Sequence, residues 1–158
     1  MILIALGANI ASPAGSPAET LRAALARLEE EGVNVVKVSS FYQTPAWPDP
    51  ADPVFTNAVA MLATELPPAA LLALLHRTET QFGRERSAKN APRSLDLDLL
   101  DYDGRIEAGP PVLPHPRIAE RDFVLRPLAD ISSGWRHPVS GLTVGELLFR
   151  LAETVAKA

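Results

Sequence analysis

Cysteine is absent from the 158 residues. Its absence excludes disulfides, thiolate zinc sites and a cysteine nucleophile, and it suits a reducing compartment. An excess of positive charge is also missing, because 15 Lys and Arg stand against 19 Asp and Glu, for a formal net charge of -4. Such a chain has no bulk positive field to hold a nucleic-acid backbone or an anionic membrane. Any anion-binding surface must therefore be local.

Long apolar runs are lacking as well. The apolar residues 1–6 have no basic leader and soon meet Gly7 and Asn9, which argues against a signal peptide. No run approaches the ~20 apolar residues of a membrane span. We therefore expect a cytoplasmic protein with no membrane and no nucleic acid among its partners. At this length we expect a single domain over residues 1–158, and a monomer.

Hydrophobic periodicity and turn residues predict an alternation of strands and helices. Ser16 to Glu19 form a capping box with proline at the first helical position, and Pro67 with Pro68 opens a second helix that Gly83 ends. Residues rich in β-branched and apolar side chains predict the strands. The predicted strands cover residues 1–6, 33–42, 54–62 and 95–99, and the helices lie between the first and second strands and between the third and fourth.

The order strand, helix, strand, strand, helix, strand predicts an α+β fold. It is the order of a ferredoxin-like antiparallel sheet with helices packed on one face. The C-terminal additions comprise a proline-rich loop at residues 109–116, an apolar segment at residues 123–131 and a last helix. A second capping box, Thr143 to Glu146, begins that helix.

Asp96 and Asp98 are the sharpest local feature. Two residues apart on a strand, they point to the same face with Cα atoms roughly 6 to 7 Å apart, so hard cations could bind between their oxygens. The alternative is a solvated sheet face with two ordinary surface acids. An arginine-rich loop just before them favours a site for a metal-bound nucleotide, whose phosphates need both kinds of partner.

That loop, residues 84–93, carries three arginines and a lysine against one glutamate. It could instead be a solvated connection that offsets a helix dipole. Arg93, however, lies at the start of the strand with both aspartates, where a guanidinium could contact phosphate. No Walker-type phosphate loop occurs in the sequence, so side chains would have to hold the phosphates.

The run KNAPRSLDLDLL at residues 89–100 resembles the signature of the 6-hydroxymethyl-7,8-dihydropterin pyrophosphokinase family. The resemblance covers nearly the whole chain, because further segments follow the family in the same order: residues 6–9, 39–45, 55–58, 82–84, 112–115 and 121–123. It implies transfer of pyrophosphate from ATP to the hydroxymethyl group of a reduced pterin in folate biosynthesis, with release of AMP.

The resemblance also implies roles for individual residues. Asp96 and Asp98 would hold two Mg²⁺ ions on the ATP co-substrate, and Arg84 and Arg93 would steady the transferring group. The remaining implied ligands fall into two sets. The ATP ligands would be Glu79, Arg86, Arg93, Leu99, His115 and Arg121, and the pterin ligands would be Thr44, Pro45, Trp47, Phe55, Asn57, Asp96 and Phe123.

Two positions depart from some family members. Some family members have an aromatic residue in place of Asn90 and a tyrosine in place of Pro116. We therefore expect altered nucleotide contacts or loop motion rather than lost chemistry. Two other functions stay open. A ferredoxin-like module could sense a metabolite without turnover, and a sheet face could bind single-stranded RNA, although two aspartates on an acidic protein speak against the latter.

Overall fold

The structure, a computed structural model, describes residues 1–46, 49–84 and 92–157. It is α+β, as the sequence predicts. Its elements, in chain order, are β1 (Ile2–Ala8), α1 (Pro17–Glu30), β2 (Asn34–Val38), β3 (Tyr42–Thr44), β4 (Phe55–Ala63), α2 (Pro68–Gln81), β5 (Asp96–Tyr102), the 3-10 helix η1 (Ile118–Glu120), α3 (Asp122–Ile131) and α4 (Val144–Lys157).

The strands form an antiparallel sheet in the order β2-β4-β1-β5, and β3 pairs with the other end of β4. The predicted strand over residues 33–42 is therefore wrong in one respect. The chain leaves the ladder after Val38 and returns at Tyr42 as a separate short strand. Within β2, the register shifts between Val35 and Lys37, as it does at a β-bulge.

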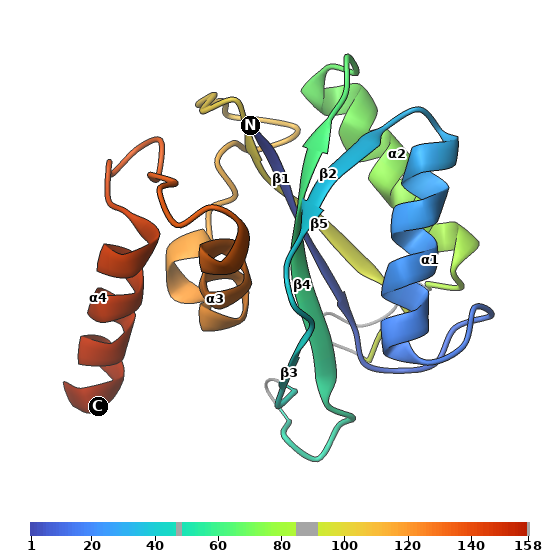
Figure 1. Ribbon diagram of the computed structural model, residues 1–158. Helices are drawn as coiled ribbons and strands as arrows, with labels where there is room; N and C mark the ends of the chain where they lie inside the picture. Colours follow the sequence, from blue (N-terminus) through green and yellow to red (C-terminus); the bar gives the residue numbers. More distant parts are fainter. Residues whose placement is uncertain (47–48, 85–91, 158) are drawn as a thin grey trace.

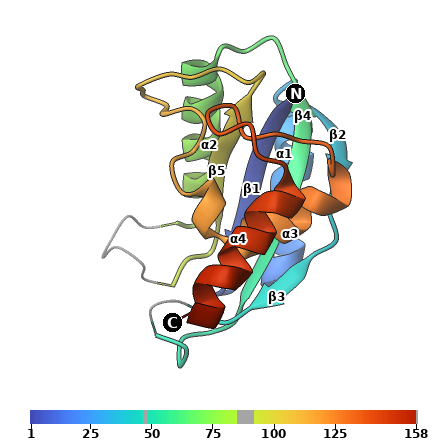
Figure 2. The same cartoon turned by 90° about the vertical axis from the view of Figure 1, so that its left-hand side faces the viewer.

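Helices cover both faces of the sheet. Figure 1 shows α1 and α2 on one side and α3, with α4 outside it, on the other. Alternation along β4 sends Ala58, Ala60 and Leu62 to the core under α1 and α2, and Val59 and Met61 to the core under α3. The C-terminal additions thus build the second layer, and Figure 2 shows α4 lying across α3.

Both predicted capping boxes are present. The Ser16 side chain accepts from the backbone N–H of Glu19, whose carboxylate accepts from the Ser16 N–H. At α4, the Thr143 hydroxyl accepts from the Glu146 N–H, and the Glu146 carboxylate accepts from the Thr143 N–H. Within the described residues, no helix combines the length and apolar character of a membrane span.

The register of the three central strands places the site. Gly7 of β1 lies opposite Asn57 of β4 on one side and opposite Asp96 of β5 on the other. Directly opposed residues of an antiparallel pair point to the same face. The amide of Asn57 and the carboxylate of Asp96 therefore lie at one level of the sheet, on the α3 face, with a glycine between them.

Candidate active site

A pocket of about 420 Å³ opens on this face of the sheet, beside the start of α3. Ala5, Leu6 and Gly7 of β1 form its floor together with Asn57 and Ala58 of β4. Its walls share a mixture of aromatic, charged and small polar side chains. They are Thr44, Pro45, Phe55, Arg93, Asp96, Arg117, Glu120, Arg121, Asp122, Phe123 and Val124. A pocket of this size with aromatic and polar side chains in its lining suits a small polar heterocycle.

Gly7 allows the close approach of strands and side chains at the pocket floor. A Cβ atom at this position would lie 2.9 Å from Oδ1 of Asn57 and 3.8 Å from the Phe55 ring. The Asn57 amide nitrogen donates to Oγ1 of Thr44 at 2.7 Å. The absence of a side chain at Gly7 therefore gives Asn57 the room to turn its amide along the pocket floor towards Thr44.

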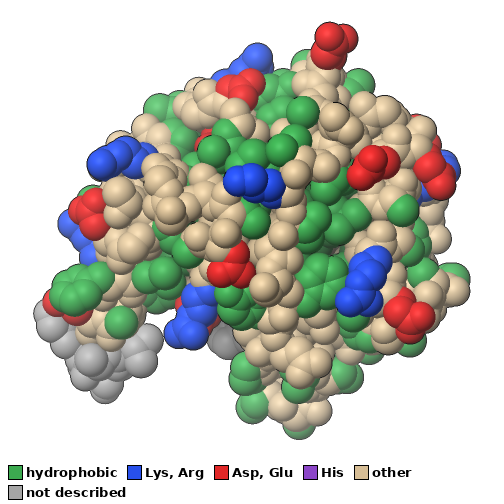
Figure 3. Space-filling view, in the orientation of Figure 1, with side chains coloured by type: hydrophobic (Ala, Val, Ile, Leu, Met, Phe, Trp, Pro, Cys, Tyr) green, Lys and Arg blue, Asp and Glu red, His purple; other side chains and the backbone are tan. Residues whose placement is uncertain are grey.

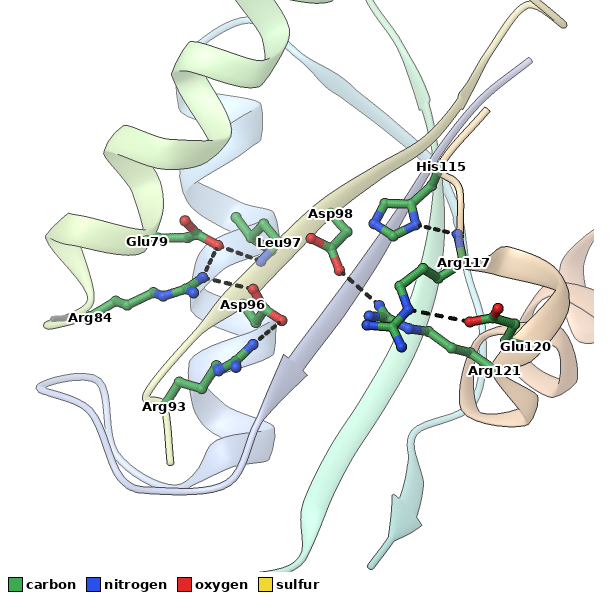
Figure 4. A network of polar contacts seen from close by, with 10 residues as sticks. All are labelled: Glu79, Arg84, Arg93, Asp96, Leu97, Asp98, His115, Arg117, Glu120 and Arg121. Atoms are coloured by element: carbon green, nitrogen blue, oxygen red, sulfur yellow. Dashed lines mark hydrogen bonds and ion pairs between the residues drawn. The ribbon is translucent and has the colours of Figure 1, made fainter. Parts of the chain in front are cut away.

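Asp96 is held by two arginines at the pocket edge. One of its carboxylate oxygens accepts from Arg84 at 2.7 Å, and the other accepts from Arg93 at 2.9 Å (Figure 4). Burial lowers the pKa of Arg84, but the carboxylates of Asp96 and Glu79 outweigh this effect and leave the pKa raised. Two guanidinium groups therefore lie within one hydrogen bond of the Asp96 carboxylate.

Asp98 lies on the same face of β5 and points the other way along the site, towards Arg121 at 3.5 Å (Figure 4). Burial, together with the neighbouring charge of Asp96, raises the pKa of Asp98 to about 6. Two carboxylates that repel each other in this manner are stabilised by a cation placed between them. The prediction that Asp96 and Asp98 share one face is confirmed.

Glu79 supports this arrangement from behind. Its side chain is only 3% exposed, and one carboxylate oxygen accepts from Arg84 at 2.6 Å and from the backbone N–H of Leu97 at 2.8 Å. Glu79 belongs to the last turn of α2, so it joins that helix to β5. The contacts seen are those of a residue that positions Arg84.

His115 closes the far side of the site (Figure 4). Its Nδ1 accepts from the backbone N–H of Arg117 at 3.2 Å, and its own backbone N–H donates to Leu100 of β5. Burial and the cation of Arg121 lower the pKa of His115 to about 4. Because Nδ1 accepts a hydrogen bond, the neutral ring carries its proton on Nε2 and presents a donor there.

Arg121 connects the acidic pair with the aromatic part of the pocket. Its guanidinium lies 5.5 Å from the centre of the Phe123 ring while it contacts Asp98. A cation over an aromatic face is favourable. The Arg121 side chain therefore contacts both the Phe123 ring and the Asp98 carboxylate.

The structure brings most of the predicted residues together. Thr44, Pro45, Phe55, Asn57, Arg93, Asp96, Arg121 and Phe123 line the pocket, while Glu79, Arg84, Asp98 and His115 lie beside it. Leu99 is different, since its side chain is buried in the core under α1 and α2. Trp47, Arg86, Lys89 and Asn90 lie outside the described residues, so their roles stay predictions.

Sequence reasoning missed three charged residues of the pocket wall: Arg117, Glu120 and Asp122. Arg117 and Glu120 form an ion pair at 3.3 Å. Asp122 belongs to the family segment at residues 121–123, and Arg117 and Glu120 lie in the polar residues before it, but no role for any of the three was predicted from the sequence. Gly7 was quoted only as part of a family segment, and its close contact with Asn57 depends on strand pairing.

An α+β protein with paired carboxylates, arginines and two aromatic rings at one pocket has the make-up of an enzyme that transfers phosphoryl groups from a nucleotide. Residues 3–133 match the model of the 7,8-dihydro-6-hydroxymethylpterin-pyrophosphokinase family. The chain belongs to this family.

Curated relatives agree with the family match. The chain is 42% identical over 132 residues to the 2-amino-4-hydroxy-6-hydroxymethyldihydropteridine pyrophosphokinase of Bacillus subtilis, covering 81% of this chain and 75% of the relative. It is 38% identical over 148 residues to the protein of the same name in Synechocystis sp., covering 92% and 73%. The folic acid synthesis protein fol1 of Pneumocystis carinii is 33% identical over 153 residues, covering 96% of this chain and 20% of that protein. The chain thus spans about a fifth of that longer relative.

Proposed function

We propose that the chain transfers the pyrophosphoryl group of ATP to the hydroxymethyl oxygen of 6-hydroxymethyl-7,8-dihydropterin and releases AMP. Family membership and the names of the relatives support pyrophosphokinase activity in folate biosynthesis, with ATP as co-substrate. The observation that carries the residue-level proposal is the position of Asp96 and Asp98 between Arg84, Arg93 and Arg121, at the edge of a pocket with two aromatic side chains.

Asp96 and Asp98 suit Mg²⁺ that arrives with the nucleotide. The described residues contain no group of three or more acidic or histidine side chains that could hold a metal by themselves. Magnesium commonly uses one or two carboxylates and takes its other ligands from phosphate and water. Burial and the charge of Asp96 both raise the pKa of Asp98, and a cation beside the two carboxylates would offset both effects. We propose two ions at this pair.

The reaction forms a bond between the pterin hydroxymethyl oxygen and the β-phosphorus and breaks the bond from that phosphorus to the α-phosphate oxygen. Bound Mg²⁺ would neutralise phosphate charge and acidify the attacking hydroxyl. Arg84 and Arg93 would offset charge on the transferring group, and Glu79 holds Arg84 in place for this task. Both arginines contact Asp96, and phosphate oxygens would compete with that carboxylate for their guanidinium groups once it binds metal.

We also propose ATP contacts for the remaining predicted ligands. His115 offers its Nε2 donor and Arg121 its guanidinium to phosphate oxygens. Arg86, outside the described residues, stays a predicted ligand, whereas Leu99 has its side chain in the core on the other face of the sheet and could contact ATP only through its backbone. The departures at Asn90 and Pro116 are expected to change nucleotide affinity without removing these groups.

The pterin is proposed to stack between Phe55 and Phe123, with Asn57 binding its amide edge. Both rings line the pocket, and Asn57 lies on the floor with its amide nitrogen turned to Thr44. Aromatic faces suit a flat heterocycle, and an amide matches its donors and acceptors. Thr44 and Pro45 line one side of the pocket, and Trp47, outside the described residues, stays a predicted pterin ligand there.

Several broader proposals accompany this one. The strand order supports a ferredoxin-like sheet, and we propose that residues 1–158 form one domain. In the face shown in Figure 3, described Lys and Arg side chains are interspersed with Asp and Glu rather than gathered in a broad patch. This pattern supports a protein without a nucleic-acid partner. The monomeric state and the cytoplasmic location stay predictions.

The direct test combines the protein with Mg²⁺, ATP and 6-hydroxymethyl-7,8-dihydropterin and resolves the nucleotide and pterin products. We expect AMP and pyrophosphorylated pterin in equal amounts. Asp98→Asn should lower kcat at least about 100-fold, because it removes a charge that the metal needs. Asp103→Asn is the matched control, since Asp103 contacts the N-terminal ammonium outside the pocket, and it should retain activity.

The products decide between the possible functions. ADP in place of AMP would show ordinary phosphoryl transfer and overturn the pyrophosphokinase proposal. Pterin binding without any turnover would indicate a sensor module instead. Full activity in Asp98→Asn would contradict the role given to the acidic pair.

A further inference from the structure

Tyr42 ties the short strand β3 to helix α3. Its hydroxyl lies 2.9 Å from Oδ1 and 2.7 Å from Oδ2 of Asp130, so it donates to the carboxylate of a residue 88 positions away. The bond to a carboxylate is charge-assisted and therefore stronger than a neutral one. The same bond raises the pKa of Tyr42, as expected for a phenol hydroxyl that donates to a carboxylate.

The strand that carries Tyr42 leads directly into the pocket. β3 has three residues, and its pairing partner in the sheet is β4, with Tyr42 opposite Asn57 and Thr44 opposite Phe55. Thr44 accepts from Asn57 and lines the pocket together with Pro45. A strand this short has little ladder to hold it, so a bond from its first residue has a large share in fixing its position.

The helix that carries Asp130 leads to the opposite wall. α3 begins with Asp122 and Phe123 at the pocket, and Asp130 lies in its last turn. Val124, Leu125 and Leu128 pack this helix into the core against the sheet. The helix is therefore a firm support, and Tyr42 fastens the less firmly held strand to it.

We infer that Tyr42 and Asp130 are positioning residues for the pterin, because their bond sets the separation between the wall with Thr44 and Pro45 and the wall with Phe123. This inference rests on the proposed function. Neither residue lines the pocket, so both act through the walls that they join. Loss of the bond widens the pterin side of the pocket and leaves Asp96 and Asp98 of β5, with Arg84 and Arg93, in place.

The test compares Tyr42→Phe and Asp130→Ala with the wild-type chain. We expect a three- to tenfold rise in KM for the pterin, with kcat and KM for ATP changed less than about twofold. Asp130→Asn keeps an acceptor for the tyrosine hydroxyl and should restore much of the affinity. The double variant Tyr42→Phe/Asp130→Ala should be no worse than either single one, since both remove the same bond.

Tyr102→Phe is the matched control. It removes a tyrosine hydroxyl that donates to the carbonyl of Leu66, at the end of β5 opposite to Asp96. The two ends of this strand are roughly 20 Å apart. The control should lower the free energy of unfolding and leave KM for the pterin unchanged.

Three results would overturn the inference. They are an unchanged KM for the pterin in Tyr42→Phe, an equal rise in both KM values, and a rise in Tyr102→Phe of the same size. A fluorescence titration with 6-hydroxymethylpterin, in the presence of Mg²⁺ and a non-hydrolysable ATP analogue, separates this inference from the proposed function. If the wild-type chain forms no AMP but Tyr42→Phe still binds the pterin more weakly than the wild type, the proposed reaction is overturned and the role of Tyr42 is supported.

Discussion

His115 illustrates how a single residue acquires its state from its neighbours. It belongs to a loop between two prolines, where sequence alone gives no reason for an unusual ring. The fold places it near Arg121 and lets the Arg117 N–H fix its tautomer. A neutral donor suits a site that receives phosphate without a protonation step.

The lowered pKa of His115 predicts how stability depends on pH. Its folded-state pKa of about 4 lies below the ordinary value of 6.5, so the unfolded chain takes up the proton first as the pH falls. The contribution is fully present above pH 6.5 and is lost between 6.5 and 4. By linkage this shift amounts to about 2 kcal/mol between pH 7.5 and pH 5, and solvent screening of the partly exposed ring reduces it. His115→Asn, whose Oδ1 can accept from the Arg117 N–H, should therefore lose about 1 kcal/mol less stability than the wild type over this range.

Urea unfolding at a series of pH values measures this difference. His137→Asn offers a comparison on a loop remote from the pocket, where burial also lowers the pKa of the ring. Parallel pH profiles for His115→Asn and the wild-type chain would contradict the neutral, buried state of His115.

At the scale of elements, a buried carboxylate joins α2 to β5 in addition to their shared core. Glu79 ends the buried stripe of α2 and accepts from the Leu97 N–H of β5, while Arg84 follows just after the helix. A buried backbone donor without its acceptor costs about 1 to 3 kcal/mol. The contact of Glu79 with the Leu97 N–H therefore also helps to position Arg84 in the site.

Two substitutions at Glu79 separate these roles. Glu79→Gln can still accept from the Leu97 N–H but no longer attracts Arg84 by charge, so kcat should fall about tenfold with a stability loss of about 1 kcal/mol or less. Glu79→Ala should lose about 2 to 3 kcal/mol of stability as well. Chemical denaturation and steady-state kinetics measure the two effects. Wild-type kcat in Glu79→Gln would show that Asp96 alone positions Arg84.

At the scale of the whole molecule, the site draws on both layers of helices. The acidic pair and Asn57 come from the sheet, Glu79 comes from α2 on one face, and Phe123 and Arg121 come from the start of α3 on the other. Ligands that bridge these parts bind the folded chain and not the unfolded one. They must therefore raise its thermal stability.

Binding of ligands should raise Tm by an amount that depends on Mg²⁺. The two ligands are a non-hydrolysable ATP analogue with Mg²⁺ and 6-hydroxymethylpterin, each at about 100 times its Kd. Each ligand should raise the free energy of unfolding by roughly 3 kcal/mol, and thus Tm by about 5 to 10 °C for a chain of this size. Differential scanning fluorimetry measures the shift. Chelation of Mg²⁺ and Asp98→Asn should each remove most of the nucleotide's part, and an equal shift under chelation would contradict a metal-dependent site.

Much of the fold could be predicted from local chemistry. Capping boxes at Ser16 and Thr143, paired prolines before α2 and the alternation along β4 each depend on neighbours a few residues away. The break between β2 and β3 could not be predicted in this way. Tyr42 fits a strand by its own preference, and only pairing with β4 shows that it starts a new one.

The sequence by itself determined the α+β class, the shared face of Asp96 and Asp98 and the family, because strand periodicity and a twelve-residue signature are local properties. The tertiary structure decided which arginine contacts which carboxylate, the approach of Asn57 to Gly7, the place of Arg117 in the pocket wall and the bond from Tyr42 to Asp130. These contacts join residues far apart in the chain. Strand register and helix packing set their distances, and no local pattern encodes either.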